Sequence, residues 1–381
     1  MAKIEGTSAL TKIGRLMKRT RYPMWLQLLW VAAATVILSR LPVLRAQAPN
    51  ATAPAIKGSF EKITVHGKSL EGNLEGDSPD RDVFVYLPPS YARDTARRYP
   101  VVYFLHGYGA TAQAYVRMLN LPQAGENAMI QSGREMILVL PDAFSKYSGS
   151  MYSNSLTTGD WEGYVSSDLV AYIDTHYRTI ANRDGRGLAG HSMGGYGTVR
   201  IGMKQPAVFS SLYVMSACCL MNNPAQGRGT SPATPAAAPA TAPAAGQPAG
   251  RGGGNRGGGG LANALSAQAA AWAPNPMNPP DYFDLPTKDG VVQPLIAAKW
   301  IANSPLVMVD QYVPSLKQYK AIAIDVGNED PLGAANKDLD QALTRLGVMH
   351  TFELYEGTHA SRVRERFETK VISFFAQHLK F

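Results

Sequence analysis

The glycine-rich stretch GLAGHSMGGYG, residues 187–197, is the feature that most constrains the fold of this chain. A short apolar run precedes it and a helical pattern follows it, so Ser192 falls between a predicted strand and a predicted helix. In the frame Gly-His-Ser-Met-Gly, a sharp strand-to-helix turn lifts the serine hydroxyl clear of the sheet, and the glycines let neighbouring backbone approach closely. A phosphate loop needs a lysine that is missing here, and a flexible loop does not fit the periodic apolar flanks. The pattern predicts a strained turn that presents Ser192.

Short apolar runs alternate with helical patterns on both sides of this turn. PVVYFLHG and MILVLPD are continuous apolar runs that end in turn signals, as strands buried on both faces do. Residues 111–132 and 163–180 have helical patterns, and the sheet resumes at YKAIAIDVG and HTFELYEG. This alternation predicts an α/β fold, a mainly parallel central sheet with helices on both faces.

The composition changes twice along the chain. Residues 49–59 are typical of a linker, and residues 60–381 are predicted to form one domain. Within it, residues 223–260 consist almost entirely of Pro, Ala, Gly and small polar residues, which have too little apolar surface to fold. This segment is predicted to be a disordered insertion, after which residues 261–300 are expected to form helices.

The first 48 residues hold nearly all of the net charge. Eight of the Lys and Arg residues and one acid lie there, giving +7 of the total +8, so the remaining chain is almost neutral. A nearly neutral body argues against a nucleic-acid partner. The cationic start, the apolar run Met24–Leu38 and the small residues Ala46 and Ala48 are typical of a secretory signal peptide. The run is short for a membrane span.

Two arginines, Arg40 and Arg45, fall where a signal peptide is usually neutral. Retention of residues 1–48 as an N-terminal anchor therefore stays an alternative to cleavage, and it is the one membrane contact we expect. Both alternatives place the body of the protein outside the cytoplasm, in the periplasm or the medium.

The chain has two cysteines, Cys218 and Cys219, which are adjacent in the apolar run SSLYVMSACCL. Two cysteines cannot form a disulfide framework, their spacing does not suggest zinc, and a ring between neighbours is strained. We expect both to be small buried side chains on a strand, and we expect no metal or organic cofactor.

A serine hydroxyl is a poor nucleophile at neutral pH and needs a histidine base oriented by a carboxylate. On a sheet of this kind the chain order is serine, acid, histidine, each in a loop after a strand. Asp330 follows the strand AIAIDVG and His359 follows FELYEG, so these two are the predicted partners of Ser192. Asp325 and Glu329 remain alternatives for the acid.

His359 is the predicted base because it alone lies downstream in the right loop. The remaining histidines are assigned to surface or packing positions on strands and helices, or to shaping the glycine turns: His66, His176, His350 and His378, then His106 and His191.

Acyl transfer through a serine also requires backbone N–H groups that stabilise an oxyanion. One donor is predicted at Met193, after the nucleophile, and the other at Tyr108 in the loop FLHGYG. Trp161 and Tyr164 are candidates either for the substrate pocket or for the core. The pair Arg362 and Arg364 either favours anionic substrates or begins a solvated helix.

The segments YFLHGYG, DLVAYIDTHY, LAGHSMGGYGT, DVGNEDPL and YEGTHA, in this order, resemble the "putative esterase" family. That family includes esterase D (S-formylglutathione hydrolase), feruloyl and acetyl-xylan esterases, and mycolyltransferases of the antigen 85 type. The resemblance covers residues 60–222 and 290–381. It implies an α/β-hydrolase fold and serine ester chemistry through Ser192, Asp330 and His359, with oxyanion donors at Tyr108 and Met193.

The chain departs from the family at two places that would contact substrate. THASRVRERF carries arginines where family members often have an aromatic residue, and the Pro/Ala/Gly-rich insertion is atypical. The leading hypothesis is an exported serine carboxylic-ester hydrolase acting on small acyl or aryl esters, including carbohydrate-linked feruloyl or acetyl esters. An acyltransferase of mycolyltransferase type and a non-catalytic glycan-binding protein are the alternatives.

Overall fold

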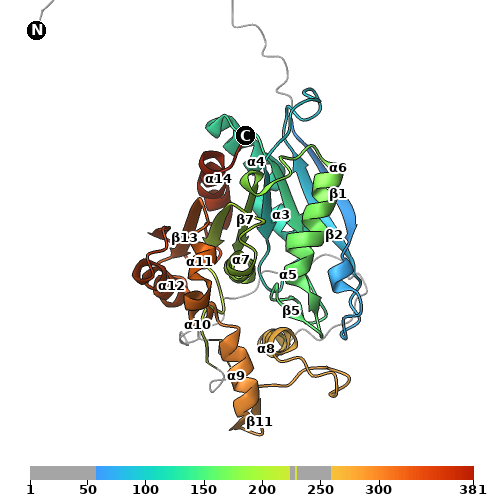
Figure 1. Ribbon diagram of the computed structural model, residues 1–381, viewed down its shortest axis with the longest axis vertical. Coiled ribbons are helices and arrows are strands. Elements are labelled where there is room, and N and C mark those ends of the chain that lie inside the picture. The colour runs from blue at the N-terminus through green and yellow to red at the C-terminus, as the bar shows by residue number, and fades with distance from the viewer. Residues whose placement is uncertain (1–56, 224–227, 230–258) are drawn as a thin grey trace, which may run out of the picture. The chain divides into compact units, whose positions relative to one another are not determined.

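An eight-stranded sheet runs through the centre of the domain (Figure 1). The computed structural model describes residues 57–223, 228–229 and 259–381. In spatial order the strands are β1 (Ser59–His66), β2 (Asp80–Leu87), β4 (Ile137–Pro141), β3 (Val101–Leu105), β7 (Arg186–His191), β8 (Ser211–Met215), β13 (Ala321–Gly327) and β14 (Thr351–Tyr355). From β4 to β14 all neighbours are parallel, while β1 and β2 pair antiparallel at one edge.

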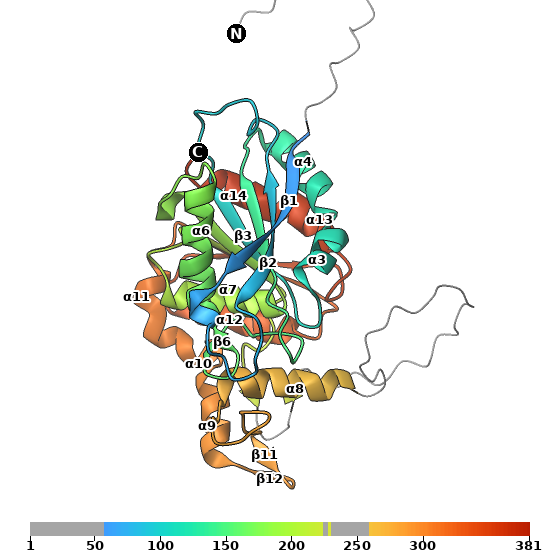
Figure 2. The ribbon, with the colours of Figure 1, turned by 90° about the vertical axis from the view of Figure 1, so that its right-hand side faces the viewer.

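Helices cover both faces of the sheet, which explains why β3, β4 and β8 are buried at every position. Figure 2 shows α3, α4 and α13 on one side of the strands and α6 and α11 on the other. The first layer comprises α3 (Ala112–Leu119), α4 (Leu121–Ser132), α13 (Val363–Arg366) and α14 (Ile372–His378); the second comprises α6 (Leu169–His176), α7 (Met193–Lys204), α11 (Val313–Leu316) and α12 (Gly333–Arg345). The predicted α/β architecture is confirmed.

The described chain contains four further α-helices and three two-stranded pairs. They are α5 (Trp161–Gly163), α8 (Gly259–Trp272), α9 (Pro294–Ala302) and α10 (Pro305–Met308), with the two-stranded pairs β5 (Asn154–Ser155) and β6 (Gly159–Asp160), β9 (Asn222–Asn223) and β10 (Arg228–Gly229), and β11 (Thr287–Lys288) and β12 (Val291–Val292). Single π-helical turns, Tyr164–Asp168 and Phe367–Val371, join α5 to α6 and α13 to α14. None of the helices in these ranges is long and apolar enough to cross a membrane.

Several predicted elements differ from the structure. The helix expected over 111–132 is two helices, because Asn120 adopts a left-handed conformation with φ of 47° and turns the chain between them. Residues 261–300 form α8 and α9 with the β11–β12 hairpin between them, and the last residue of the predicted linker, Ser59, already belongs to β1. The signal peptide or anchor at 1–48, most of the 49–59 linker and most of the 223–260 insertion lie outside the described residues.

The strand that was expected to carry the two cysteines ends early. β8 stops at Met215, so Cys218 and Cys219 lie in the loop that follows it, and both are partly exposed. The expectation of two buried strand residues is wrong, because Ser216 has a φ of 43° and turns the chain out of the sheet.

One buried ion pair joins the helical layer to the sheet. Arg366 at the end of α13 donates from Nε to Asp325 Oδ2 on β13 at 2.6 Å, and from Nη2 to Glu353 Oε2 on β14 at 2.8 Å. The side chains of Arg366 and Asp325 are 5% and 1% exposed, so neither charge is hydrated. Tyr213 also donates its hydroxyl to Asp325. The pair therefore fixes α13 against the carboxyl half of the sheet.

Replacing Arg366 with methionine is expected to destabilise the protein by about 3–5 kcal/mol, because the Asp325 carboxylate is left buried without its counter-charge. The free energy of unfolding in urea measures this. Arg364→Met is the matched control on the same helix, because Arg364 is exposed, and its midpoint should stay close to that of the parent. Equal midpoints for the two variants would contradict the assignment.

Candidate active site

Ser192 occupies a strained turn between β7 and α7. Its φ of 60° and ψ of −113° lie in a region that residues other than glycine rarely adopt. The Ser192 amide donates to the carbonyl of Met215 at 3.0 Å, and the Ser192 carbonyl accepts from the amide of Cys218 at 3.1 Å. One hydrogen bond to the last residue of β8 and one to the loop that follows it thus hold the strained residue that the sequence frame predicted.

The two glycines of the frame are required by close backbone contacts. A Cβ on Gly190 would lie 2.3 Å from the Gly194 carbonyl oxygen, and a Cβ on Gly194 would lie 1.9 Å from the carbonyl oxygen of Leu105. No real Cβ atom approaches backbone so closely. The glycines therefore allow the turn to close on itself and to pack against the end of β3.

The structure brings the three predicted residues into one hydrogen-bonded chain. The Oγ of Ser192 lies 2.9 Å from Nε2 of His359, and Nδ1 of His359 lies 2.8 Å from Oδ2 of Asp330. In the tautomer that donates from Nδ1 to the carboxylate, Nε2 is the atom that faces the serine hydroxyl as an acceptor. This is the tautomer that a general base for Ser192 requires.

The acid and base loops are joined backbone to backbone. A Cβ on Gly327, at the end of β13, would lie 2.1 Å from the carbonyl oxygen of Gly357 in the loop after β14. The amide of Asn328 donates to Tyr355, the amide of Glu329 donates to Gly357, and the side-chain oxygen of Asn328 accepts from the Gly357 amide. The contact between these two loops sets the separation of the Asp330 and His359 side chains. Asn328 is therefore a positioning residue, and sequence analysis did not identify it.

The surroundings of the three candidate acids decide among them. Asp325 accepts from Arg366 and Tyr213, and Glu329 is exposed to solvent. Asp330 is buried; burial works against its ionisation, but hydrogen bonds from His359 and from the Leu332 amide outweigh it and hold the pKa of the carboxyl below its ordinary value. Asp330 is therefore a carboxylate at neutral pH and faces the imidazole.

His191 has a second role that sequence analysis missed. Its Nδ1 accepts from the Tyr115 hydroxyl at 2.7 Å and its Nε2 donates to the backbone carbonyl of His359 at 2.8 Å. Burial, together with the nearby His359, lowers the pKa of His191 to about 4, so the ring is neutral under physiological conditions. The residue before the nucleophile thus holds the backbone of the predicted base.

The loop predicted to hold one oxyanion donor lies against the nucleophile. A Cβ on Gly107 would lie 3.3 Å from the Cβ of Ser192, which places Gly107 beside the serine. A Cβ on Gly149 would lie 2.6 Å from Sδ of Met193 and 2.8 Å from the ring of Tyr108, so the side chains of both residues border the same loop. Because Met193 is the first residue of α7, its amide has no acceptor within the helix.

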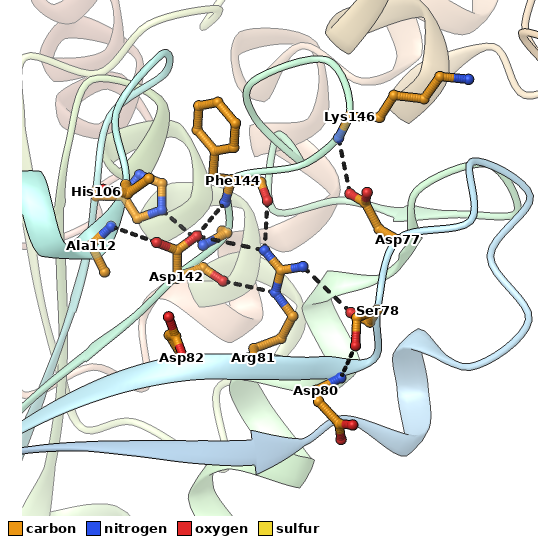
Figure 3. Close-up of polar contacts among 12 residues, drawn as sticks. Asp77, Ser78, Asp80, Arg81, Asp82, His106, Ala112, Asp142, Phe144 and Lys146 are labelled. Atoms are coloured by element: carbon orange, nitrogen blue, oxygen red, sulfur yellow. Dashed lines mark hydrogen bonds and ion pairs between the residues drawn. The ribbon is translucent and has the colours of Figure 1, made fainter. Parts of the chain in front are cut away.

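Hydrogen bonds of His106, Asp142 and Arg81 hold the loop after β3 in place (Figure 3). His106 is buried, and its Nε2 accepts from the amide of Ala143 at 2.8 Å. Asp142 accepts from the amides of Ala112 and Phe144, both at 2.9 Å, and Arg81 donates from Nε to the Asp142 carbonyl. The loop after β3 is therefore tied to the loop after β4, and His106 shapes the turn as predicted.

Two predicted pocket candidates lie in the core instead. Trp161 and Tyr164 are 1% and 0% exposed and pack edge to face with ring centroids 5.5 Å apart. Of the two arginines, Arg362 pairs with Glu365 and Arg364 is exposed. Pairing with Glu365 neutralises one of the two charges that were considered for anionic substrates.

The other histidines lie away from Ser192 or make local contacts. His66 pairs with Asp80 and Glu71, His350 with Asp340, His176 with Tyr172, and His378 packs on Phe374. Within the described ranges no group of His, Cys, Asp or Glu residues could hold a metal ion.

Comparison with known proteins gives a family match over most of the domain. Residues 78–373 match the family described as "Putative esterase". "Esterase Rv1288" of Mycobacterium tuberculosis is 35% identical over 133 residues, which are 34% of this chain and 27% of the relative. An "Endo-1,4-beta-xylanase/feruloyl esterase" of Xylanibacter ruminicola is 27% identical over 157 residues, 40% of this chain and 20% of the relative. The matched part spans about a quarter of these curated relatives.

Solved structures share the fold at lower identity. A ferulic acid esterase superposes with a TM-score of 0.59 at 20% identity, covering 85% of this chain and 100% of the other. An S-formylglutathione hydrolase from Agrobacterium tumefaciens gives 0.55 at 16% identity, covering 86% and 98%. These likenesses support the α/β-hydrolase fold.

Removing the His191 hydrogen bond to His359 is expected to slow the reaction of Ser192 with a fluorophosphonate by about tenfold or more, because the base loses its backbone support. His191→Phe removes the Nε2 donor, whereas His191→Gln keeps an N–H of similar reach and should retain more of the rate. Labelling rates of the two folded variants measure the effect. If glutamine and phenylalanine slow labelling equally, or neither slows it, the positioning role is wrong.

Proposed function

Because this chain belongs to the "Putative esterase" family, we propose that it is a serine carboxylic-ester hydrolase that works through an acyl-enzyme. The observation that carries the proposal is the hydrogen-bonded chain from Ser192 through His359 to Asp330, with separations of 2.9 and 2.8 Å. The strained serine turn and the adjoining loop at Tyr108 supply the other parts that ester chemistry needs.

The proposed mechanism uses these groups in two half-reactions. His359 Nε2 takes the proton from Ser192 Oγ as the oxygen attacks the ester carbonyl, and Asp330 stabilises the imidazolium. The amides of Tyr108 and Met193 donate to the oxyanion of the tetrahedral intermediate. His359 then protonates the departing alkoxide, which leaves an acyl group on Ser192. Water, deprotonated by His359, releases the acid and regenerates the serine.

We further propose that the substrates are small acyl or aryl esters, including those linked to carbohydrate. A cavity of about 810 Å³ is lined by residues between Asn275 and Ile296, with amides, carboxylates, Lys288 and the ring of Phe283. Tyr147 contacts both a wall of this cavity and the loop at Tyr108: its ring centroid lies 5.3 Å from that of Phe283, and its carbonyl accepts from the Tyr108 hydroxyl. The amide and carboxylate groups, together with the ring of Phe283, suit a sugar bearing an aryl ester.

Hydrolysis of p-nitrophenyl acetate by the purified protein tests the proposal. The parent is expected to turn over, Ser192→Ala to lose activity while remaining folded, and Asp330→Asn to lose about 10⁴-fold in kcat because His359 takes the wrong tautomer. Release of p-nitrophenolate gives the rates, and circular dichroism verifies folding.

Glu329→Gln is the matched control for the acid, since Glu329 is adjacent but exposed and its loss should leave the rate unchanged. Adding an alcohol acceptor separates hydrolysis from acyl transfer: ester formation at the expense of acid would indicate a transferase. A folded parent that neither hydrolyses short esters nor transfers their acyl group would favour a glycan-binding protein.

We also propose that the protein is exported, on the basis of the cationic start and the apolar run Met24–Leu38. Cell fractionation followed by mass spectrometry of the N-terminus is expected to find the chain outside the cytoplasm, beginning after Ala48. An intact N-terminus in the membrane fraction would indicate the anchor instead. Recovery of the intact chain from the cytosol would contradict export.

A further inference from the structure

The loop after β8 holds two adjacent cysteines, one of which donates its backbone amide to Ser192. Sγ of Cys219 and Sγ of Cys218 lie 2.9 Å apart, so less than about 1 Å of movement separates them from the length of a disulfide bond. Cys219 has a φ of 57°, in the left-handed region that residues other than glycine rarely adopt. Gln268 on α8 donates from Nε2 to Cys219 Sγ at 3.5 Å. Both residues are partly exposed.

We propose that Cys218 and Cys219 form a reversible vicinal disulfide that changes the reactivity of Ser192. Formation of the disulfide does not depend on the proposed function. The change in reactivity does, because it rests on Ser192 being the nucleophile of the proposed esterase. A thiolate of the pair attacks a small disulfide such as glutathione disulfide and expels one glutathione thiolate; the second cysteine then attacks the mixed disulfide and expels the other. Two protein thiols are oxidised and one glutathione disulfide is reduced to two thiols.

The resulting bond is expected to be easily reduced. The Cα atoms of neighbouring residues are about 3.8 Å apart across a trans peptide, which is shorter than the usual disulfide range of about 4.4–6.8 Å. Strained disulfides have higher reduction potentials than structural ones and serve as labile or regulatory bonds. The pair is therefore suited to respond to redox conditions and unsuited to stabilise the fold.

The loop is anchored on both sides of the cysteines. Before them, the amide of Ser216 donates to the carbonyl of Asp325, and Asn336 binds both the amide and the carbonyl of Ala217. After them, the carbonyl of Leu220 accepts from the amide of Leu306. A change in backbone torsion on ring closure must therefore be absorbed at residues 218 and 219 themselves.

One of these two residues is bonded to the nucleophile. The Cys218 amide donates to the Ser192 carbonyl at 3.1 Å, one of the two contacts that hold the strained turn. Closing an eight-membered ring at Cys218 shifts this donor, and with it the position of Ser192 Oγ relative to His359. Since small displacements of reacting groups cost large factors in rate, the two redox states should differ in serine reactivity.

The experiment equilibrates the purified protein in a series of glutathione and glutathione disulfide buffers. Each sample is quenched with acid, alkylated with N-ethylmaleimide and weighed intact. Because the chain has no other cysteines, an unalkylated monomer lighter by two hydrogen atoms identifies the vicinal bond. In parallel, the rate of Ser192 labelling by a fluorophosphonate is measured. We expect the bond to form, dithiothreitol to reverse it, and the labelling rates of the two states to differ by about threefold or more.

Cys218→Ser and Cys219→Ser are the matched controls. In samples whose intact mass shows no glutathione adduct, neither variant should have a labelling rate that depends on the redox buffer. Two alkylated thiols, glutathione adducts or linked dimers across the whole series, without the intramolecular bond, would overturn the proposal. A vicinal bond that leaves the labelling rate unchanged would overturn its effect on Ser192. If the disulfide forms and changes the labelling rate but the protein hydrolyses no ester, the proposed function is wrong and the redox proposal stands.

Discussion

The strained turn at Ser192 is the constraint on which the rest of the site depends. A positive φ in a serine is unfavourable by itself and persists only when surrounding contacts determine it. Those contacts come from the Met215 carbonyl at the end of β8, from the Cys218 amide in the loop that follows, and from the close approach of Gly194 to the end of β3. Three neighbouring strands, β3, β7 and β8, therefore hold the Ser192 hydroxyl. The position of the hydroxyl depends on how these strands are placed in the sheet.

The base reaches this hydroxyl from a different direction. His359 lies in a loop after the edge strand β14, where a loop would ordinarily be mobile. Its position is fixed by three contacts of different origin: the backbone join to the Asp330 loop at Gly327 and Gly357, the hydrogen bond to Asp330, and the donation from His191 to its carbonyl. The donor of the last contact, His191, directly precedes Ser192 in the chain. Ser192 and His359 are therefore linked through the His359 backbone as well as through their reacting atoms.

Sequence reasoning found the parts that are local and missed those that depend on distant partners. The elbow, the order of serine, acid and histidine, and the parallel sheet follow from short motifs and apolar runs, and the structure contains them. The break at Asn120 was missed because a left-handed asparagine leaves the helical pattern unchanged on either side. The function of His191 was missed because its partners, Tyr115 and the carbonyl of His359, are 76 and 168 positions away.

The choice among three acids illustrates what a sequence leaves open. Asp325, Glu329 and Asp330 lie within six positions, the first near the end of the strand AIAIDVG and the other two in the loop that follows it. What separates them is the partner that each carboxylate already has. Arg366 and Tyr213 occupy Asp325, and no motif links an arginine 41 positions downstream to it. Asp330 instead has one oxygen on the Leu332 amide and the other on His359. The acid can therefore be identified from the partners of each carboxylate. Asp325 is already paired with an arginine, whereas Asp330 is buried, has no arginine or lysine partner among the described residues, and is free to orient the imidazole of His359.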